Sequence, residues 1–105
     1  MIRIPEQREP THPGEMLLEE FLIPMEISQQ ELADAIQTPY KNMNEIINKK
    51  TGVPPGIAVR LAKFFGMSET FWLNLQQRWD IYNIKKSEEE ILQSIRTLKD
   101  LKGLR

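Results

Sequence analysis

The sequence predicts an all-α protein, because helix start signals recur along its 105 residues and apolar residues follow them at helical spacing. The strongest signals lie between Ser28 and Lys50. Ser28 is a good N-cap, and Glu31, three residues later, completes a capping box. A second start signal follows at Thr38 and Pro39, with threonine as the N-cap and proline at the first helical position. We therefore expect two short helices joined by a tight turn.

The second of these helices has two distinct faces. Its apolar face consists of Met43, Ile46 and Ile47. The opposite face is a polar stripe at the helical spacing i, i+3, i+4, i+7, made by Lys41, Asn44, Glu45 and Asn48. Lysine, asparagine and glutamate can hydrogen-bond the major-groove edges of guanine, adenine and cytosine. With the small Ala33 letting the helices cross closely, the pattern favours a helix-turn-helix, and a helical hairpin with a solvated polar face is the open alternative.

Length and composition are those of one globular domain. Hydrophobic residues make up 40% of the chain and the mean hydropathy is −0.46. No apolar run approaches the ~20 residues of a membrane span, and the N-terminus lacks the apolar core of a signal peptide. The absence of cysteine excludes disulfides and thiolate metal sites. We therefore expect a cytoplasmic protein without membrane contact.

Charge is distributed unevenly. The net charge of −1 and the pI of about 5.9 argue weakly against non-specific nucleic-acid binding. Residues 1–37 carry two basic and eight acidic side chains, residues 38–63 carry five basic and one acidic, and residues 64–105 carry seven basic and six acidic. The positive charge thus lies on and just after the second helix of the motif, where phosphates would lie. The acidic N-terminal third would face away from DNA or toward a basic protein.

The N-terminal part of the chain should be an irregular arm over residues 1–11, followed by a domain over residues 12–84 whose motif spans 28–50. Pro13 suits the first position of a helix that Pro24 ends or bends. His12 is the only histidine, so a capping or packing role is favoured over a metal or catalytic one.

Two further helices follow the motif. One starts at Pro54 or Pro55 and stops at Gly66, and Ser68 caps the next. An aromatic stripe then recurs at helical spacing. Its first members, Phe71, Trp72 and Leu75, are expected in the core. Its later members, Trp79 and Tyr82, are expected to pack against a second subunit.

The C-terminal residues 85–105 should form an additional amphipathic helix. Ser87 and Glu90 make a capping box at its start. Its apolar stripe consists of Ile91, Leu92, Ile95, Leu98 and Leu101. Such a stripe docks back on its own domain or pairs with another chain, and we favour a partner or a dimer.

Two segments resemble a known family: HPGEMLLEEFLIPMEISQQELADAI, and the later NEIINKKTGVPPGIAVRLAKFFGMSETFWLNLQQRWDIY. They resemble the HigA antitoxins, which belong to the phage-repressor-like (XRE/Cro-type) helix-turn-helix regulators. The resemblance runs from about His12 to Tyr82. It implies a five-helix domain that binds its own promoter, double-stranded operator DNA, as a homodimer. It also implies neutralisation of a HigB toxin, a RelE-like ribonuclease that cleaves messenger RNA.

The resemblance also implies site residues. Gln29 begins the first helix of the motif, where a backbone phosphate is usually contacted. The DNA-binding set that we predict is Gln29, Thr38, Tyr40, Lys41, Asn44, Glu45, Asn48 and Lys49. The predicted dimer interface is Trp79 and Tyr82. No catalytic residue, metal or cofactor is expected.

Three positions depart from the family pattern. Gln37 stands where the turn usually has glycine, and a left-handed conformation there would cost about 1–2 kcal/mol. Pro39 replaces a small polar residue, which would remove one groove contact. Lys49 replaces a common glycine after the second helix, and Asn48 could itself adopt the left-handed cap.

Three other classes of function compete with a repressor antitoxin. One is a regulator of the same fold without a toxin, which a gene standing alone would favour. Another is a module that binds only protein, which the acidic N-terminal part favours. An enzyme is disfavoured, because no nucleophile–base pair, metal cluster or phosphate loop is present. The carboxylates occur in runs typical of a solvated face: Glu19, Glu20, Glu88, Glu89 and Glu90.

Overall fold

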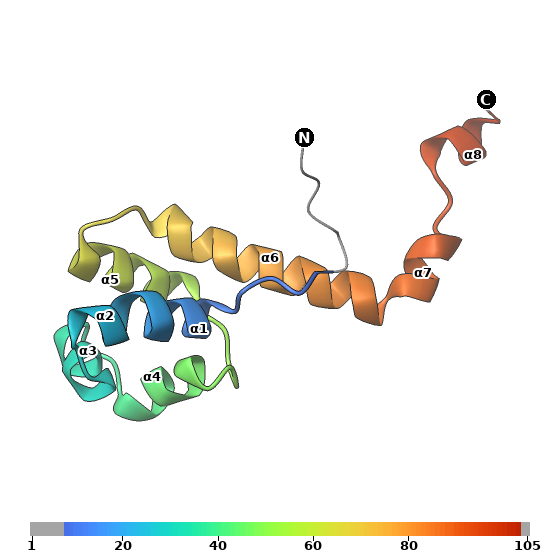
Figure 1. Ribbon diagram of the computed structural model, residues 1–105. Coiled ribbons are helices and arrows are strands. Elements are labelled where there is room, and N and C mark those ends of the chain that lie inside the picture. The colour runs from blue at the N-terminus through green and yellow to red at the C-terminus, as the bar shows by residue number, and fades with distance from the viewer. Residues whose placement is uncertain (1–7, 104–105) are drawn as a thin grey trace, which may run out of the picture.

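The computed structural model describes residues 8–103, and every regular element in that range is helical, which confirms the all-α prediction (Figure 1). Residues 8–11 are irregular. Residues 1–7 of the predicted arm and residues 104–105 of the predicted C-terminal helix lie outside the described part. The elements are α1 (Pro13–Leu17), η1 (Leu18–Leu22), α2 (Ile23–Met25), α3 (Gln29–Ala35), α4 (Tyr40–Ile47), α5 (Pro55–Phe65), α6 (Glu69–Ser87), α7 (Glu89–Ser94) and α8 (Leu98–Lys102).

The first three elements form one continuous helical rod with a π-helical middle turn. A proline inside a regular α-helix removes one hydrogen bond and crowds the carbonyl four residues earlier. In the wider turn before Pro24, the Ile23 N–H donates to the carbonyl oxygen of Leu18, five residues back. This turn accommodates the proline, so the rod continues to Met25 and ends at Glu26 in a left-handed conformation.

The core lies between the α1–α2 rod, the α3–α4 pair and the α5–α6 pair. α5 packs along α6, and α1 contacts both α4 and α6. Trp72 is fully buried and Leu75 nearly so, and Phe71 packs partly buried against the same cluster, as the aromatic stripe predicted. The largest fully buried hydrophobic side chains are Trp72, Leu17, Leu32, Met43 and Leu61. Burying each is worth about 1.5–3 kcal/mol relative to exposure.

Most predicted helix ends are confirmed. Ser28 and Glu31 form a reciprocal capping box, and the Ser68 hydroxyl accepts from the Thr70 N–H. Gly66 ends α5 with φ at 68°. Thr38, however, is not the N-cap of α4: that position is taken by Pro39, without a side-chain cap. Because proline has φ fixed near −65°, its backbone alone sets the entry into the helix.

The C-terminal part differs from the predicted single helix. α6 continues to Ser87, across the predicted boundary at residue 84, and Ser87 makes no capping box with Glu90. Its hydroxyl instead lies 3.4 Å from the Ile84 carbonyl oxygen in the last turn of α6. A short α7 follows, Ile95 is extended, and α8 starts with a capping box formed by Thr97 and Asp100. The radius of gyration is 17.9 Å, against about 13 Å for a compact chain of this length, because these helices lead away from the body (Figure 1).

No helix among the described residues is long and apolar enough to cross a membrane.

Candidate nucleic-acid interface

α3 and α4 form the predicted helix-turn-helix. The Ser28 capping box begins α3, with Oγ accepting from the Glu31 N–H at 3.0 Å and Glu31 Oε1 accepting from the Ser28 N–H at 2.9 Å. The hydrogen bond from the Ser28 N–H, and after it the Ser28 hydroxyl, holds the pKa of the Glu31 carboxyl below its ordinary value. Ala33 is fully buried, which lets α4 cross α3 closely. The sequence thus predicted both the start of the motif, at Ser28, and the close crossing of its helices at Ala33.

The two faces of α4 separate as the sequence predicted. Met43, Ile46 and Ile47 are buried in the core. On the outer side, Tyr40 is 45% exposed and Lys41 is exposed, while Asn44 and Glu45 are half-buried. Asn42 is also exposed beside Lys41, and the sequence interpretation overlooked it because it lies outside the i, i+3, i+4 stripe.

Side-chain amides connect the start of α3 to the end of α4. Asn44 Nδ2 donates to Gln29 Oε1 at 3.1 Å, and Asn48 Nδ2 donates to Asn44 Oδ1 at 3.1 Å and to the Asn44 carbonyl oxygen at 2.9 Å. Each amide nitrogen carries two donors and each oxygen two lone pairs. Asn44 therefore holds Gln29 and Asn48 in place and keeps one donor and one acceptor site for a further partner.

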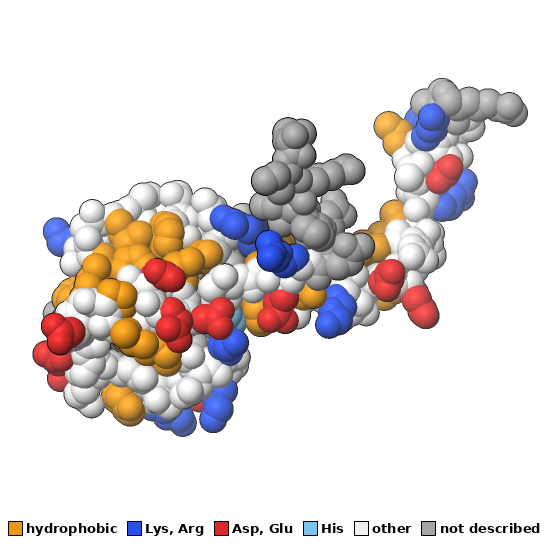
Figure 2. Space-filling view, viewed as in Figure 1, with side chains coloured by type: hydrophobic (Ala, Val, Ile, Leu, Met, Phe, Trp, Pro, Cys, Tyr) orange, Lys and Arg blue, Asp and Glu red, His pale blue; other side chains and the backbone are white. Residues whose placement is uncertain are grey.

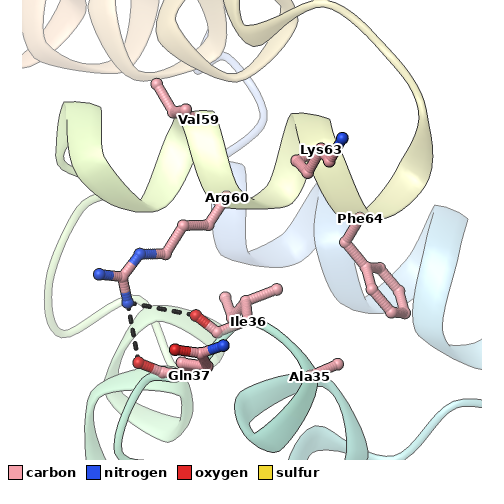
Figure 3. Close-up of a pocket in the computed structure, with 7 residues that line it drawn as sticks. All are labelled: Ala35, Ile36, Gln37, Val59, Arg60, Lys63 and Phe64. Carbon is pink, nitrogen blue, oxygen red and sulfur yellow. Dashed lines mark hydrogen bonds between the residues drawn. The ribbon is translucent and has the colours of Figure 1, made fainter.

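The turn of the motif is held by a residue from α5 (Figure 3). Gln37 has φ at 58°, so the left-handed conformation expected of this position is present although glycine is not. Arg60 Nη1 donates to the carbonyl oxygens of Gln37 at 2.8 Å and Ile36 at 3.2 Å. Arg60 lies in a shallow hollow of about 470 Å³ beside this turn. It satisfies carbonyls that a helix end leaves unpaired. Sequence reasoning missed it because its partners lie 23 and 24 residues earlier in the chain. The Thr38 N–H donates to the Ala33 carbonyl oxygen at 2.9 Å.

The prediction that Asn48 could take the left-handed cap at the end of α4 is wrong. Asn48 has φ at −86° and does not adopt the left-handed cap, whereas Lys49 does, with φ at 61°. The Lys49 ammonium lies 3.7 Å from Glu15 Oε1 on α1, and both side chains are nearly half exposed. Exposed ion pairs of this kind contribute little stability, so releasing Lys49 from Glu15 would cost little.

The start of α1 packs directly against α4. His12 is buried and caps α1, with Nδ1 accepting from the Gly14 N–H at 2.9 Å, which confirms its capping and packing role. A Cβ on Gly14 would lie 1.9 Å from the Ile46 carbonyl oxygen, so only glycine allows this approach. Burial lowers the pKa of the His12 ring, and the charge of Lys49 lowers it further, against smaller raising effects of Glu15 and Asp80.

The two residues predicted for a dimer interface lie on α6 and are both half-buried. The Trp79 ring meets the His12 ring edge to face, with centroids 4.9 Å apart. Trp79 therefore has a partner within its own chain, and its contact with a second subunit stays a prediction, as does that of Tyr82.

Acidic and basic side chains lie on different parts of the surface of the body. In Figure 2, acidic side chains lie over the α1–α2 rod and α3, and Lys and Arg side chains lie along the edge formed by α4. No lysine or arginine occurs between Glu9 and Tyr40, whereas Lys41, Lys49 and Lys50 lie on or just after α4. A polyanion would therefore meet the α4 edge first.

The chain is similar over most of its length to several bacterial proteins. It is 36% identical over 80 residues to virulence-associated protein I of Dichelobacter nodosus, a match that covers 76% of this chain and 74% of that protein. It is 33% identical over 92 residues to antitoxin HigA-1 of Vibrio cholerae, covering 88% of this chain and 87% of the relative. The chain belongs to the HigA antitoxin family. No protein-family model matches it.

The fold agrees with that of a solved member of the HigA family. The Pseudomonas aeruginosa antitoxin HigA, solved with the higBA promoter, superposes with a TM-score of 0.82 at 33% identity, over 85% of this chain and 98% of that one. The HigA relatives are antitoxins and helix-turn-helix regulators rather than enzymes. Within residues 8–103, no group of three or more histidine, aspartate or glutamate side chains could hold a metal ion.

Proposed function

We propose that this protein is an antitoxin that represses its own operon by inserting α4 into the major groove of its operator. The observation that carries the proposal is the exposed polar and basic face of α4 on a helix-turn-helix whose relative from Pseudomonas aeruginosa was solved with promoter DNA. Tyr40, Lys41 and Glu45 would read base edges. Gln29, Thr38, Asn48 and Lys49 would contact the backbone, and Asn44 would orient Gln29 and Asn48 while reading one base.

A dimer follows from the proposed repression. Two copies related by a two-fold axis would read half-sites about one helical turn (~34 Å) apart in a palindromic operator. The proposed contact is Trp79 and Tyr82 on α6. Because the operator is chromosomal or plasmid DNA, we place the protein in the cytoplasm.

The proposed toxin partner is a HigB-like, RelE-like ribonuclease that cleaves messenger RNA. An enzyme that binds RNA is expected to be basic, so its antitoxin should offer an acidic face. The α1–α2 rod and α3 supply one, with exposed carboxylates and two exposed apolar side chains, Ile23 at 58% and Met25 at 51%. We propose this face for the toxin, with the C-terminal helices as the alternative surface.

Operator binding is tested by fluorescence anisotropy at physiological salt, with the DNA upstream of the operon and a scrambled duplex as the control. We expect tight binding to the native duplex alone. Equal and weak binding to both duplexes would refute the repressor proposal and leave the helix-turn-helix as a scaffold.

The role of Asn44 is tested in the same assay. Asn44→Ala should weaken operator binding by about 1–3 kcal/mol. If Asn44 acts partly through Gln29, the double variant with Gln29→Ala will lose less than the two single losses added together. Unchanged affinity of Asn44→Ala would remove it from the interface.

The toxin surface is tested by coexpression with the protein encoded by the short adjacent reading frame. Reversing the adjacent glutamates Glu19 and Glu20 to lysine should abolish copurification. A second variant tests the alternative surface by reversing another adjacent exposed pair, with Glu88→Lys and Glu89→Lys. Loss of binding only in this second variant would move the toxin surface to the C-terminal helices.

A regulator without a toxin remains the second candidate, because a relative that is 36% identical over 87 residues is described as a helix-turn-helix transcriptional regulator. A gene without an adjacent toxin frame would favour it.

A further inference from the structure

The C-terminal segment, residues 83–103, exposes every one of its side chains. Large apolar side chains that are 42–68% exposed recur along it: Ile84, Ile91, Leu92, Ile95, Leu98 and Leu101. α7 has six residues and α8 has five, and isolated helices this short are not stable in water. Figure 1 shows both leading away from the body, so the body does not cover them. A second molecule is needed to bury this stripe.

We propose that the segment binds the same segment of a second copy in an antiparallel, two-fold arrangement. The charges from Glu88 to Lys102 support this choice of partner. An acidic block, Glu88 to Glu90, precedes the apolar centre, and a basic block formed by Arg96, Lys99 and Lys102 follows it. A two-fold axis near Ile95 sets the acidic block of each copy against the basic block of the other. Parallel pairing would instead set like charges against each other.

The apolar residues support the same axis. Leu92 lies three residues before Ile95 and Leu98 lies three residues after it. In an antiparallel pair, Leu92 of one copy therefore lies opposite Leu98 of the other. Ile95 meets its own counterpart. A surface that is complementary to itself in this way gives an isologous, closed dimer.

Asp100 is the one acidic residue in the basic block. Its Oδ2 accepts from the Thr97 N–H at 3.2 Å, and its N–H donates to Thr97 Oγ1 at 3.1 Å. The carboxylate is thus directed to the start of α8, where it caps the helix. With Asp100 counted against Arg96, Lys99 and Lys102, the basic block keeps a net charge of +2 and remains opposite in sign to the acidic block.

This pairing deepens the proposed dimer and rests on it, but it lies away from Trp79 and Tyr82, so the two interfaces can be tested separately. The chain has no cysteine, so single cysteines report contacts without background. A disulfide requires Cα atoms within about 7 Å. Ile95→Cys should crosslink to itself under mild oxidation of the full chain. Val59→Cys, an exposed position on α5, is the matched control and should stay monomeric on a non-reducing gel.

The direction of pairing is tested by mixing variants. Leu92→Cys and Leu98→Cys should crosslink to each other and only weakly to themselves. Strong self-crosslinking of each with no gain on mixing would overturn the antiparallel arrangement. Absence of any crosslink, with operator binding intact, would overturn the pairing while the proposed function stands.

Charge reversal provides a readout without cysteine. One variant carries Glu88→Lys, Glu89→Lys and Glu90→Lys, and the other carries Arg96→Glu, Lys99→Glu and Lys102→Glu. Each should weaken self-association at least tenfold in analytical ultracentrifugation. An equimolar mixture of the two variants should restore it. Self-association equal to that of the natural chain in both variants would count decisively against the proposal, and fluorescence of the buried Trp72 checks that each variant is folded.

Discussion

The body and the C-terminal segment use the same kind of sequence with different results. In the body, apolar residues at helical spacing are buried: Leu32 and Met43 are fully inaccessible. In the segment, a stripe with the same spacing leaves Leu92 at 42% and Leu98 at 68% exposed. Amphipathic spacing therefore predicts that a helix has an apolar face, but not which surface covers that face.

The difference lies in what surrounds each helix. α3 and α4 are short, but α4 contacts α1, which lies far away in sequence, and α3 packs on α4 with Leu32 and Ala33 in the buried core. α7 contacts α6, which directly precedes it. Four tests address this contrast, from the largest expected effect to the smallest.

The first test truncates one leucine in each region. Leu32→Ala should lower the free energy of unfolding by about 2–5 kcal/mol, because it leaves a cavity in the core. Leu92→Ala should change it by no more than about 0.5 kcal/mol. Urea unfolding followed by fluorescence of Trp72 and Trp79 reports the body alone. Equal losses in both variants would mean that the segment is part of the cooperative body.

The second test separates packing within the body from helix propensity. Gly14→Ala should cost about 1–3 kcal/mol, because its Cβ would collide with the carbonyl of Ile46 and push α1 off α4. Gly56→Ala is the control on α5, where a Cβ meets nothing within 4 Å, and it should stabilise by about 0.4–1 kcal/mol. Operator affinity should fall in Gly14→Ala but not in Gly56→Ala, since Ile46 belongs to α4.

The third test concerns the left-handed residues that end the helices of the body. Lys49→Gly should stabilise by about 0.5–1 kcal/mol, because it relieves a strain of about 1–2 kcal/mol at some entropic cost. Gly66→Ala, at a left-handed φ of 68°, should have the opposite sign. Thermal denaturation compares the two. A destabilised Lys49→Gly would indicate that the contact with Glu15 outweighs the strain.

The smallest expected effect is a pH dependence confined to the body. Burial is the main cause that holds the pKa of His12 below its ordinary 6.5. Below that pH the unfolded chain binds more protons than the folded one, so the free energy of unfolding falls. The stability that depends on a neutral His12 ring is therefore complete above pH 6.5 and is lost as the pH falls below it. Urea midpoints at about pH 7.5 and about pH 5.5 measure the loss. His12→Asn keeps an N-cap without titrating, and its midpoint should change less; an equal change would assign the effect to carboxylates.

Much of the interface could be predicted from local sequence. The Ser28 capping box, the division of α4 into two faces and the core position of Trp72 each depend on residues a few positions apart. Arg60 could not be assigned in this way, because its two carbonyl partners lie 23 and 24 residues earlier. The link between Gln29 and Asn44 joins side chains 15 residues apart and was missed for the same reason.

By itself, the sequence determined the helical class, the positions of most helix starts and which face of each helix is apolar, because these depend on caps, prolines and side-chain periodicity within a few turns. Tertiary structure alone decided that Lys49 rather than Asn48 takes the left-handed conformation and that Trp79 meets His12. It also decided that the last apolar stripe is left uncovered by the body. These outcomes depend on which surfaces distant parts of the chain bring together, and local spacing does not encode that.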